Sequence, residues 1–362
     1  MRSLLAVVAI ASLGAPLTAL TLAGCDERID LGASHAQSGR DRDVGGSPGA
    51  GADASDGAQA PPISAPCEGA LGGCSEAACP TARITIFEAP FAAPQTVLHL
   101  SGLGSMGDQG LALDKYLWSV DAPSGSTSRF YPTAHEPQPI FAANVAGTYR
   151  FHLRVVDERG VASCAVAEAS IDIIPTSELH IELLWHTPGD LDETDTGADA
   201  THASVGSDLD LHLLHPGATD GPDADDDGAV DGWFDPIFDT YWKLPRHFWG
   251  LPGADDDPSL DRDDTDGAGP ENLNIALPED DVCYTVGVHA WDDWGFGPSD
   301  ATVRIYVHGT LVFEPAPVRL HVGDLWEVAR VCWPLDGDPI WPVACSLDGP
   351  CVSKVIADYP VP

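Results

Sequence analysis

Hydrophobic and polar residues alternate along most of the chain after residue 67. In the clearest stretch, four apolar residues alternate with three polar ones: Tyr149, Phe151, Leu153 and Val155 against Arg150, His152 and Arg154. A period of two is typical of a strand with one buried face. No stretch shows the spacing of an amphipathic helix. The pattern therefore predicts an all-β protein.

Short strands separated by Gly and Pro turns predict two antiparallel β-sandwiches. The first occupies residues 67–175, with strands expected at 83–87, 97–100, 116–120, 140–142, 149–155 and 170–174. The second occupies residues 176–362, with strands expected at 179–185, 208–214, 283–291, 301–308, 311–313, 318–322 and 326–333. In the 301–308 strand, the alternation predicts a half-exposed face formed by Arg304, Tyr306 and His308.

The N-terminus has the parts of an export signal: Arg2, an apolar run over residues 4–22, and small residues at the cut. Gly14 and Pro16 interrupt the run and no basic cluster follows it, which argues against a membrane-spanning helix. Leu22-Ala23-Gly24-Cys25 resembles the lipobox of bacterial lipoproteins. This resemblance implies cleavage after residue 24 and a lipid on Cys25 that anchors the protein to a membrane of the bacterial cell envelope, on the periplasmic or the outer surface. Simple secretion is the alternative.

Residues 25–66 are mostly Gly, Ala, Ser, Asp and Pro, which predicts a disordered tether. The chain has nine cysteines, and lipidation of Cys25 leaves eight that can pair in an oxidising compartment. The strand positions suggest the pairs Cys67–Cys74, Cys79–Cys164, Cys283–Cys332 and Cys345–Cys351, although sequence alone does not fix the connectivity.

Motifs in both halves resemble known families. In the first half, Leu100-Ser101-Gly102-Leu103-Gly104-Ser105 and a Gly147-Thr148-Tyr149 strand followed by Asp157-x-x-Gly160 resemble a PKD domain. The resemblance covers residues 82–175 and implies an immunoglobulin-like sandwich, with Trp118 in its core, that serves as a spacer or a binding module.

In the second half, Asp208-Leu209-Asp210-Leu211-His212 combined with Asp263-Asp264-x-x-Gly267-x-Gly269-Pro270-Glu271-Asn272 resembles the YfaP-like domains of bacterial envelope proteins. This resemblance implies a jelly-roll or immunoglobulin-like fold and no established reaction. Asp208 and Asp210 fall on one face of a strand, where the acidic loop and Glu271 are predicted to join them. This second acidic cluster comprises Asp208, Asp210, Asp261, Asp263, Asp264, Asp266 and Glu271. The alternative is that Asp208 and Asp210 form the solvated face of their strand.

The net charge is −39, and the stretch from residue 186 to residue 300 contributes −26 of it, with 29 acidic and three basic residues. Such a chain offers no basic patch for a nucleic acid. The charge favours either bound divalent cations or a solubilising surface.

One acidic loop has the ligand spacing of a calcium loop. Asp223, Asp225, Asp227 and Asp231 occupy positions one, three, five and nine, Gly228 lies at position six, and Ala229 supplies the carbonyl of position seven. Phe234 replaces the usual Glu at position twelve, and Asp235 follows it. The spacing predicts a calcium ion held on a β scaffold, with a solvated turn as the alternative.

Other candidate motifs are weaker. His212 and His215 are three residues apart, which does not place both on one strand face for zinc. Ser105 lacks the first Gly of a serine nucleophile turn. The aromatic stretch 241–249 fits packing beneath an insertion slightly better than an exposed surface for sugars or partners.

Together these features predict a non-catalytic envelope lipoprotein, stabilised by calcium, that binds a surface protein or a polysaccharide. No catalytic residue is assigned. One alternative is a metal- or carboxylate-dependent hydrolase of envelope polymers, because paired carboxylates can perform acid–base catalysis when their pKa values differ. The other is a purely structural spacer.

Overall fold

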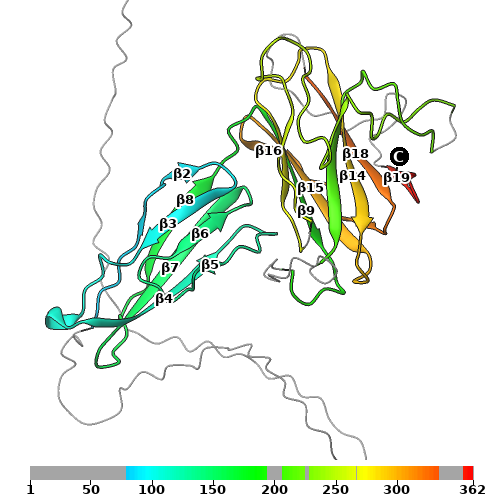
Figure 1. The fold of residues 1–362 in the computed structure, drawn as a ribbon. Coiled ribbons are helices and arrows are strands. Elements are labelled where there is room, and N and C mark those ends of the chain that lie inside the picture. The colour runs from blue at the N-terminus through cyan, green and yellow to red at the C-terminus, as the bar shows by residue number, and fades with distance from the viewer. Residues whose placement is uncertain (1–78, 194–205, 225–227, 266, 334–353, 362) are drawn as a thin grey trace, which may run out of the picture. The chain divides into compact units, whose positions relative to one another are not determined.

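The computed structural model describes residues 79–193, 206–224, 228–265, 267–333 and 354–361 (Figure 1). Within these ranges the regular structure consists of strands, with a single 3-10 turn at Asp108–Gly110. Almost all strand pairs are antiparallel. The prediction of an all-β protein is confirmed.

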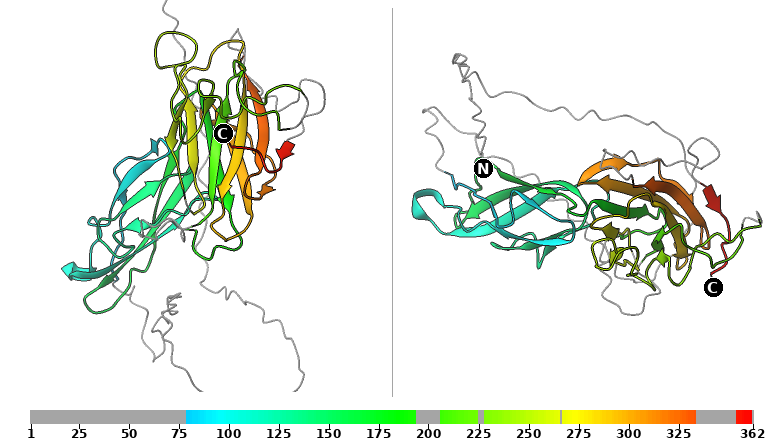
Figure 2. Two further views of the ribbon diagram at one scale, coloured as in Figure 1. Left: turned by 45° about the vertical axis from the view of Figure 1, so that its right-hand side comes forward. Right: turned by 90° about the horizontal axis from the view of Figure 1, so that it is seen from above.

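The first sandwich is built from two four-stranded sheets. One sheet has the order β1 (Thr85–Ile86), β3 (Thr96–Ser101), β6 (Ile140–Ala143) and β5 (Phe130–Tyr131). The other has the order β2 (Phe91–Ala92), β8 (Ala167–Ile173), β7 (Gly147–Asp157) and β4 (Leu113–Asp121), and β2 pairs with β8 in parallel. The layers of strands are also visible in two further views (Figure 2).

The core of the first sandwich follows the alternation along β7. The four apolar residues of that strand, from Tyr149 to Val155, are all fully buried. Trp118 is also buried in this core, and its indole N–H donates to the carbonyl of Glu136 at 2.8 Å. The predicted disulfide Cys79–Cys164 is present.

The second sandwich has a five-stranded and a larger sheet. The first has the order β11 (Asp239–Thr240), β10 (Asp208–Leu214), β14 (Cys283–Asp292), β18 (Leu325–Cys332) and β19 (Lys354–Ile356). The second has the order β12 (Ser259–Arg262), β13 (Glu271–Ile275), β9 (Leu179–His186), β15 (Ser299–Val307) and β16 (Thr310–Phe313), and β17 (Val318–Leu320) also pairs with β15. The predicted disulfide Cys283–Cys332 joins β14 to β18.

Strand β10 is buried on both faces. Leu209, Leu211 and Leu213 point into the core between the two sheets. The opposite face is buried as well, because Trp233, Phe234 and Tyr241 of the segment after β10 pack beside Leu214 in a separate apolar cluster. The interpretation of Asp208 and Asp210 as a solvated strand face is therefore wrong.

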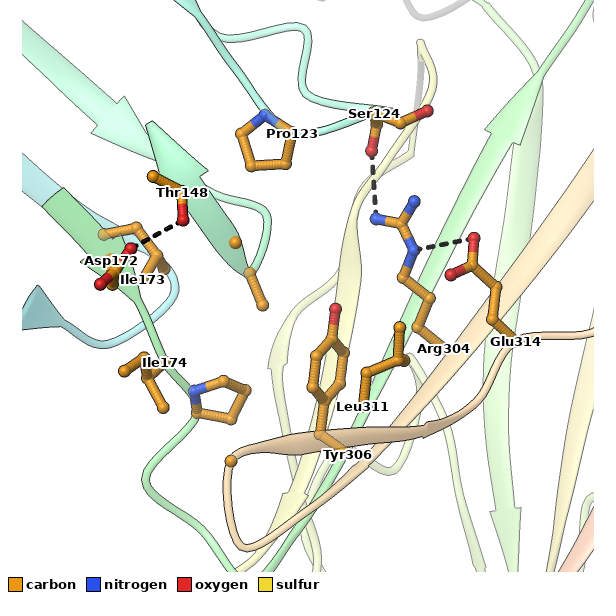
Figure 3. A pocket seen from close by; sticks show the side chains of 14 residues that line it. Pro123, Ser124, Thr148, Asp172, Ile173, Ile174, Arg304, Tyr306, Leu311 and Glu314 are labelled. Carbon is orange, nitrogen blue, oxygen red and sulfur yellow. Dashed lines mark hydrogen bonds and ion pairs between the residues drawn. The ribbon is translucent and has the colours of Figure 1, made fainter. Parts of the chain in front are cut away.

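The half-exposed face predicted for the 301–308 strand is also wrong in part. His308 is exposed, but Arg304 and Tyr306 are buried. The Arg304 guanidinium donates to the carbonyl of Ser124 at 3.0 Å and pairs with Glu314 at 3.4 Å, beside a pocket of about 400 Å³ (Figure 3). The hydrogen bond to Ser124 and the ion pair with Glu314 allow this charged side chain to be buried.

Cys25, Cys67, Cys74, Cys345 and Cys351 lie outside the described residues, as do the predicted signal segment and tether. Within the described ranges, the structure contains no helix with the length and hydrophobicity required to cross a lipid bilayer.

Candidate metal centre

The centre of the second acidic cluster lies where one side of β10 has no partner strand. β10 pairs with β14 along its whole length, but with β11 only at Leu213 and Leu214. The N–H of Leu211 donates instead to Oε2 of Glu271, on β13, at 2.6 Å. A side chain thus takes the place of a missing strand and joins the two sheets.

The second carboxylate oxygen of Glu271 is also held by the backbone. Oε1 accepts a hydrogen bond from the N–H of Asp264 at 3.1 Å. Glu271 is completely buried and fixed at both oxygens, so it holds the loop before β13 against β10. This loop brings Asp263 and Asp264 to the strand that carries Asp208 and Asp210.

Three carboxylates converge at this point. Oxygens of Asp210, Asp263 and Glu271 all lie within 4.8 Å of one another. Asp210 and Glu271 are buried, whereas Asp263 is exposed and gives the cluster access to solvent. The site is therefore a largely buried acidic cluster that solvent reaches at Asp263.

Burial and mutual repulsion both oppose ionisation of the carboxyl groups in this cluster. Burial raises the pKa of Asp208 to about 8, and repulsion from Asp210 and then Asp263 adds to the effect. Burial raises the pKa of Asp210 to about 7, and the pKa values of Asp263 and Glu271 are also raised, mainly by burial. His212 lowers the pKa of Asp210, but among the described residues no positive charge offsets the effect of burial on these carboxyl groups.

Two buried oxygens of the cluster have no hydrogen-bond partner among the described residues: Oδ1 of Asp208 and Oδ2 of Asp210. The nearest basic atom to the latter is Nδ1 of His289, at 3.8 Å, which is too long for a hydrogen bond. A buried carboxylate oxygen without a donor is costly, and a bound cation removes this cost.

The donor set fits a hard divalent cation. Calcium prefers carboxylate and carbonyl oxygens, and two oxygens bound at about 2.4 Å from one ion lie at most about 4.8 Å apart. The three converging carboxylates meet that condition. Other oxygens, including those of Asp208 or water, would complete the shell of six to eight ligands that calcium takes.

The structure separates the predicted members of this cluster. Asp261 lies on β12 and accepts hydrogen bonds from Ser259 and Asn274 at 2.7 and 2.5 Å, so it has other partners. Asp264 binds Arg262 through its carboxylate, at 2.6 Å, and contributes its backbone N–H to the site. Asp266 lies outside the described residues.

The predicted calcium loop is described only in part, because Asp225 and Asp227 lie outside the described residues. Oδ2 of Asp223 accepts from the N–H of Gly228 at 3.1 Å, and Oδ2 of Asp231 accepts from the N–H of Ala224 at 2.9 Å. Ala229 lies between them in the same loop. Calcium binding by this loop stays a prediction.

Positions twelve and thirteen of that loop have structural roles. Phe234 is buried, with its ring centroid 4.9 Å from that of His212. The Asp235 carboxylate accepts four backbone N–H groups, from residues 219, 220, 237 and 238, and these bonds lower its pKa. Asp235 therefore does not replace the missing Glu as a free ligand.

The histidines do not form a shared site. His212 pairs with Asp239 at 2.8 Å, and both side chains are fully buried. His215 lies 3.2 Å from Glu279 instead. Sequence analysis missed the pairing of His212 with Asp239 because it links a strand to a residue 27 positions away in an insertion. Ser105 also has a structural role, because its hydroxyl exchanges hydrogen bonds with the backbone of Arg83.

Comparisons with known proteins assign no family. No protein-family model and no curated protein matches the chain. One solved structure, described as "Structural basis for the promiscuous specificity of the carbohydrate-binding modules from the beta-sandwich super family", is 13% identical with a TM-score of 0.22. The match covers 67% of this chain and 98% of that chain. A similarity at this level identifies neither the fold family nor the ligand of this chain.

Proposed function

We propose that the second sandwich binds calcium at Asp210, Asp263 and Glu271, and that the ion stabilises a non-catalytic binding module. The observation that supports this most directly is the buried, unpartnered oxygen of Asp210 in a cluster of three converging carboxylates. A divalent cation there would stabilise the ionised forms of Asp208 and Asp210, whose pKa values are raised first by burial and then by neighbouring carboxylates.

The proposal places this module in the bacterial cell envelope, held by the lipid on Cys25 and the tether of residues 25–66. Its ligand would be a surface protein or a polysaccharide. The raised pKa values of the cluster would also suit acid–base catalysis. Glu271 argues for a structural centre, because backbone hydrogen bonds to both of its oxygens fix the side chain between two elements of the fold.

Titration calorimetry and thermal melts of the calcium-loaded and the chelated protein test the proposal. Calcium at 100 times its Kd would add about 2.7 kcal/mol to the free energy of unfolding. For a domain of this size, we expect the Tm to rise by roughly 5–10 °C. Asp210→Asn and Asp263→Asn should abolish the calorimetric signal of this site, and Asp261→Asn, in the neighbouring strand, is the matched control.

The predicted loop at residues 223–231 requires its own variant, because it would bind calcium independently. Asp223→Asn combined with Asp231→Asn removes two predicted calcium ligands of that loop. It leaves the carboxylates of β10 and β13 unchanged. A calcium signal that persists in Asp210→Asn but disappears in the loop variant would assign the ion to the loop and contradict the proposed centre. Unchanged melting in calcium and chelator would reject both sites.

A further inference from the structure

Two tryptophans form a solvent-facing pair close to the proposed calcium centre. Trp242 lies in the turn after β11, and Trp291 lies at the end of β14. Their ring centroids are 5.8 Å apart with an interplanar angle of 63°. Trp242 is 38% exposed and Trp291 is 39% exposed. Single exposed apolar residues are ordinary, but two contacting indoles form a surface patch that requires an explanation.

The residues beneath the pair hold it in place. Tyr241 is buried next to Trp242 and stacks on His212, with centroids 4.9 Å apart. Its backbone pairs with Leu244 in both directions, which closes a tight turn around Trp242. The ring of Trp291 contacts that of buried His289 at 6.1 Å. The pair is therefore presented on a fixed base.

Residues that donate hydrogen bonds and residues that accept them follow the two tryptophans closely in the sequence. Lys243 and Arg246, which follow Trp242, are exposed. They are two of the three basic residues between positions 186 and 300. Asp292 and Asp293 follow Trp291 and supply carboxylate acceptors.

This combination limits the chemistry of the ligand. The carboxylates of Asp292 and Asp293, in a strongly acidic segment, would repel a polyanion. Lys243 and Arg246 oppose the close approach of a polycation beside Trp242. An uncharged polysaccharide fits both, because its hydroxyls donate to carboxylates and accept from cationic side chains. The C–H faces of its pyranose rings would pack on the exposed indoles, as apolar surfaces do on aromatic rings.

We infer that Trp242 and Trp291 form a binding surface for an uncharged polysaccharide. The inference rests on the proposed function and narrows its ligand to one class. It also connects the two sites, because Asp292, next to Trp291, lies opposite Asp208 of the acidic cluster in the pairing of β14 with β10. A calcium ion at that cluster would hold the end of β14 in place, so the polysaccharide should bind more weakly in chelator.

Affinity electrophoresis in gels containing dextran, laminarin, mannan or xylan tests the inference on the whole chain, with tryptophan fluorescence as a second readout. At least one of these polymers should retard the protein. Trp242→Ala and Trp291→Ala should each weaken binding about tenfold, as loss of an aromatic contact worth about 1.4 kcal/mol would. Phe248→Ala is the control, because Phe248 is 90% exposed in the same aromatic stretch.

The same samples are also titrated with calcium. The results then distinguish failure of the proposed calcium centre from failure of the proposed polysaccharide surface. Calcium binding without retardation by any of the four polymers would overturn the polysaccharide surface and leave the metal centre standing. Retardation that needs the tryptophans but does not respond to calcium would support the surface and count against the centre. Salt-sensitive binding to poly-L-lysine alone, a stand-in for a basic protein partner, would overturn the surface. Thermal melts of each variant show that it remains folded.

Discussion

The carboxylate of Glu271 accepts the backbone N–H of Leu211 at 2.6 Å, and this bond links strands of opposite sheets. Its other oxygen accepts the N–H of Asp264. One side chain therefore satisfies two buried backbone donors and sets the distance between β10 and the acidic loop. Folding and the geometry of the metal centre depend on the same residue.

Glu271→Ala should destabilise the protein even in chelator. The substitution leaves the N–H groups of Leu211 and Asp264 without their acceptor, and each unsatisfied buried group costs about 1–3 kcal/mol. We expect the free energy of unfolding, measured by urea denaturation, to fall by about 2–6 kcal/mol. Asp261→Ala removes a carboxylate that is exposed, and its effect should be within about 0.5 kcal/mol. Equal losses in the two variants would contradict the role of Glu271.

The stability of the calcium-free protein should fall as the pH rises from 6.5 to 8. Folding raises the pKa of Asp208 from 3.8 to about 8 and that of Asp210 to about 7. A raised carboxyl pKa means that the folded state binds protons more tightly than the unfolded state. The resulting contribution to the free energy of unfolding is complete below pH 3.8 and is lost as the pH rises through the pKa values of the folded state.

His289 acts in a different range. Burial lowers the pKa of His289 from 6.5 to about 3. Its contribution to the free energy of unfolding is therefore lost as the pH falls below 6.5. Above that pH the carboxyl effect dominates. Thermal melts between pH 6.5 and 8 should therefore show a decreasing Tm in chelator, and saturating calcium or Asp208→Asn should flatten the slope. A Tm that does not fall over this range in chelator would show that these carboxyls are already ionised in the folded protein.

The strand pattern was predictable because alternation reports directly on burial. The strands expected at residues 208–214 and 283–291 match β10 and β14 to within one residue. Strands β12 and β13 were missed, because acidic residues and Gly and Pro surround them and conceal their alternation. Glu271 was therefore expected after a loop, and its position on a strand is evident only from the sheet pairing.

Three members of the predicted acidic cluster, Asp210, Asp263 and Glu271, converge, but Asp261 and Asp264 have other partners, and the burial of the cluster was not predictable. Two Asp residues on one strand face suggested a shared site, and the sequence near Glu271 suggested its partners. The burial of Asp208 and Asp210 depends on what covers their face of β10. The covering segment is an insertion anchored by Trp233 and Phe234. The pairing of Trp242 with Trp291 was also outside the reach of sequence analysis, because it joins residues 49 positions apart in sequence.

Asp235→Ala should loosen the segment after β10. The carboxylate of Asp235 accepts hydrogen bonds from four backbone N–H groups and is buried. Loss of this carboxylate should lower the free energy of unfolding by about 2–4 kcal/mol. Hydrogen bonds to a charged group are worth about 1.5–3 kcal/mol each, and water solvates some of the freed N–H groups. Amide hydrogen exchange should accelerate at residues 219 and 220. Exchange unchanged at both positions would show that other contacts hold the loop.

Gly287→Ala tests whether close packing of Trp233 holds the insertion on the sheet. A Cβ atom added at Gly287 would lie 2.5 Å from Cη2 and 2.7 Å from Cζ3 of Trp233, which is fully buried. The indole would have to move, and overpacking of this kind costs about 1–3 kcal/mol. Because Trp233 shares its apolar cluster with Phe234 and Tyr241, we also expect a shift in tryptophan fluorescence as the Tyr241–Trp242 turn is displaced. Gly104→Ala is the matched control, since its nearest neighbour, Arg83, would lie 3.6 Å away. Full stability in Gly287→Ala would mean that the insertion adapts to the added methyl group and is less tightly packed than the structure indicates.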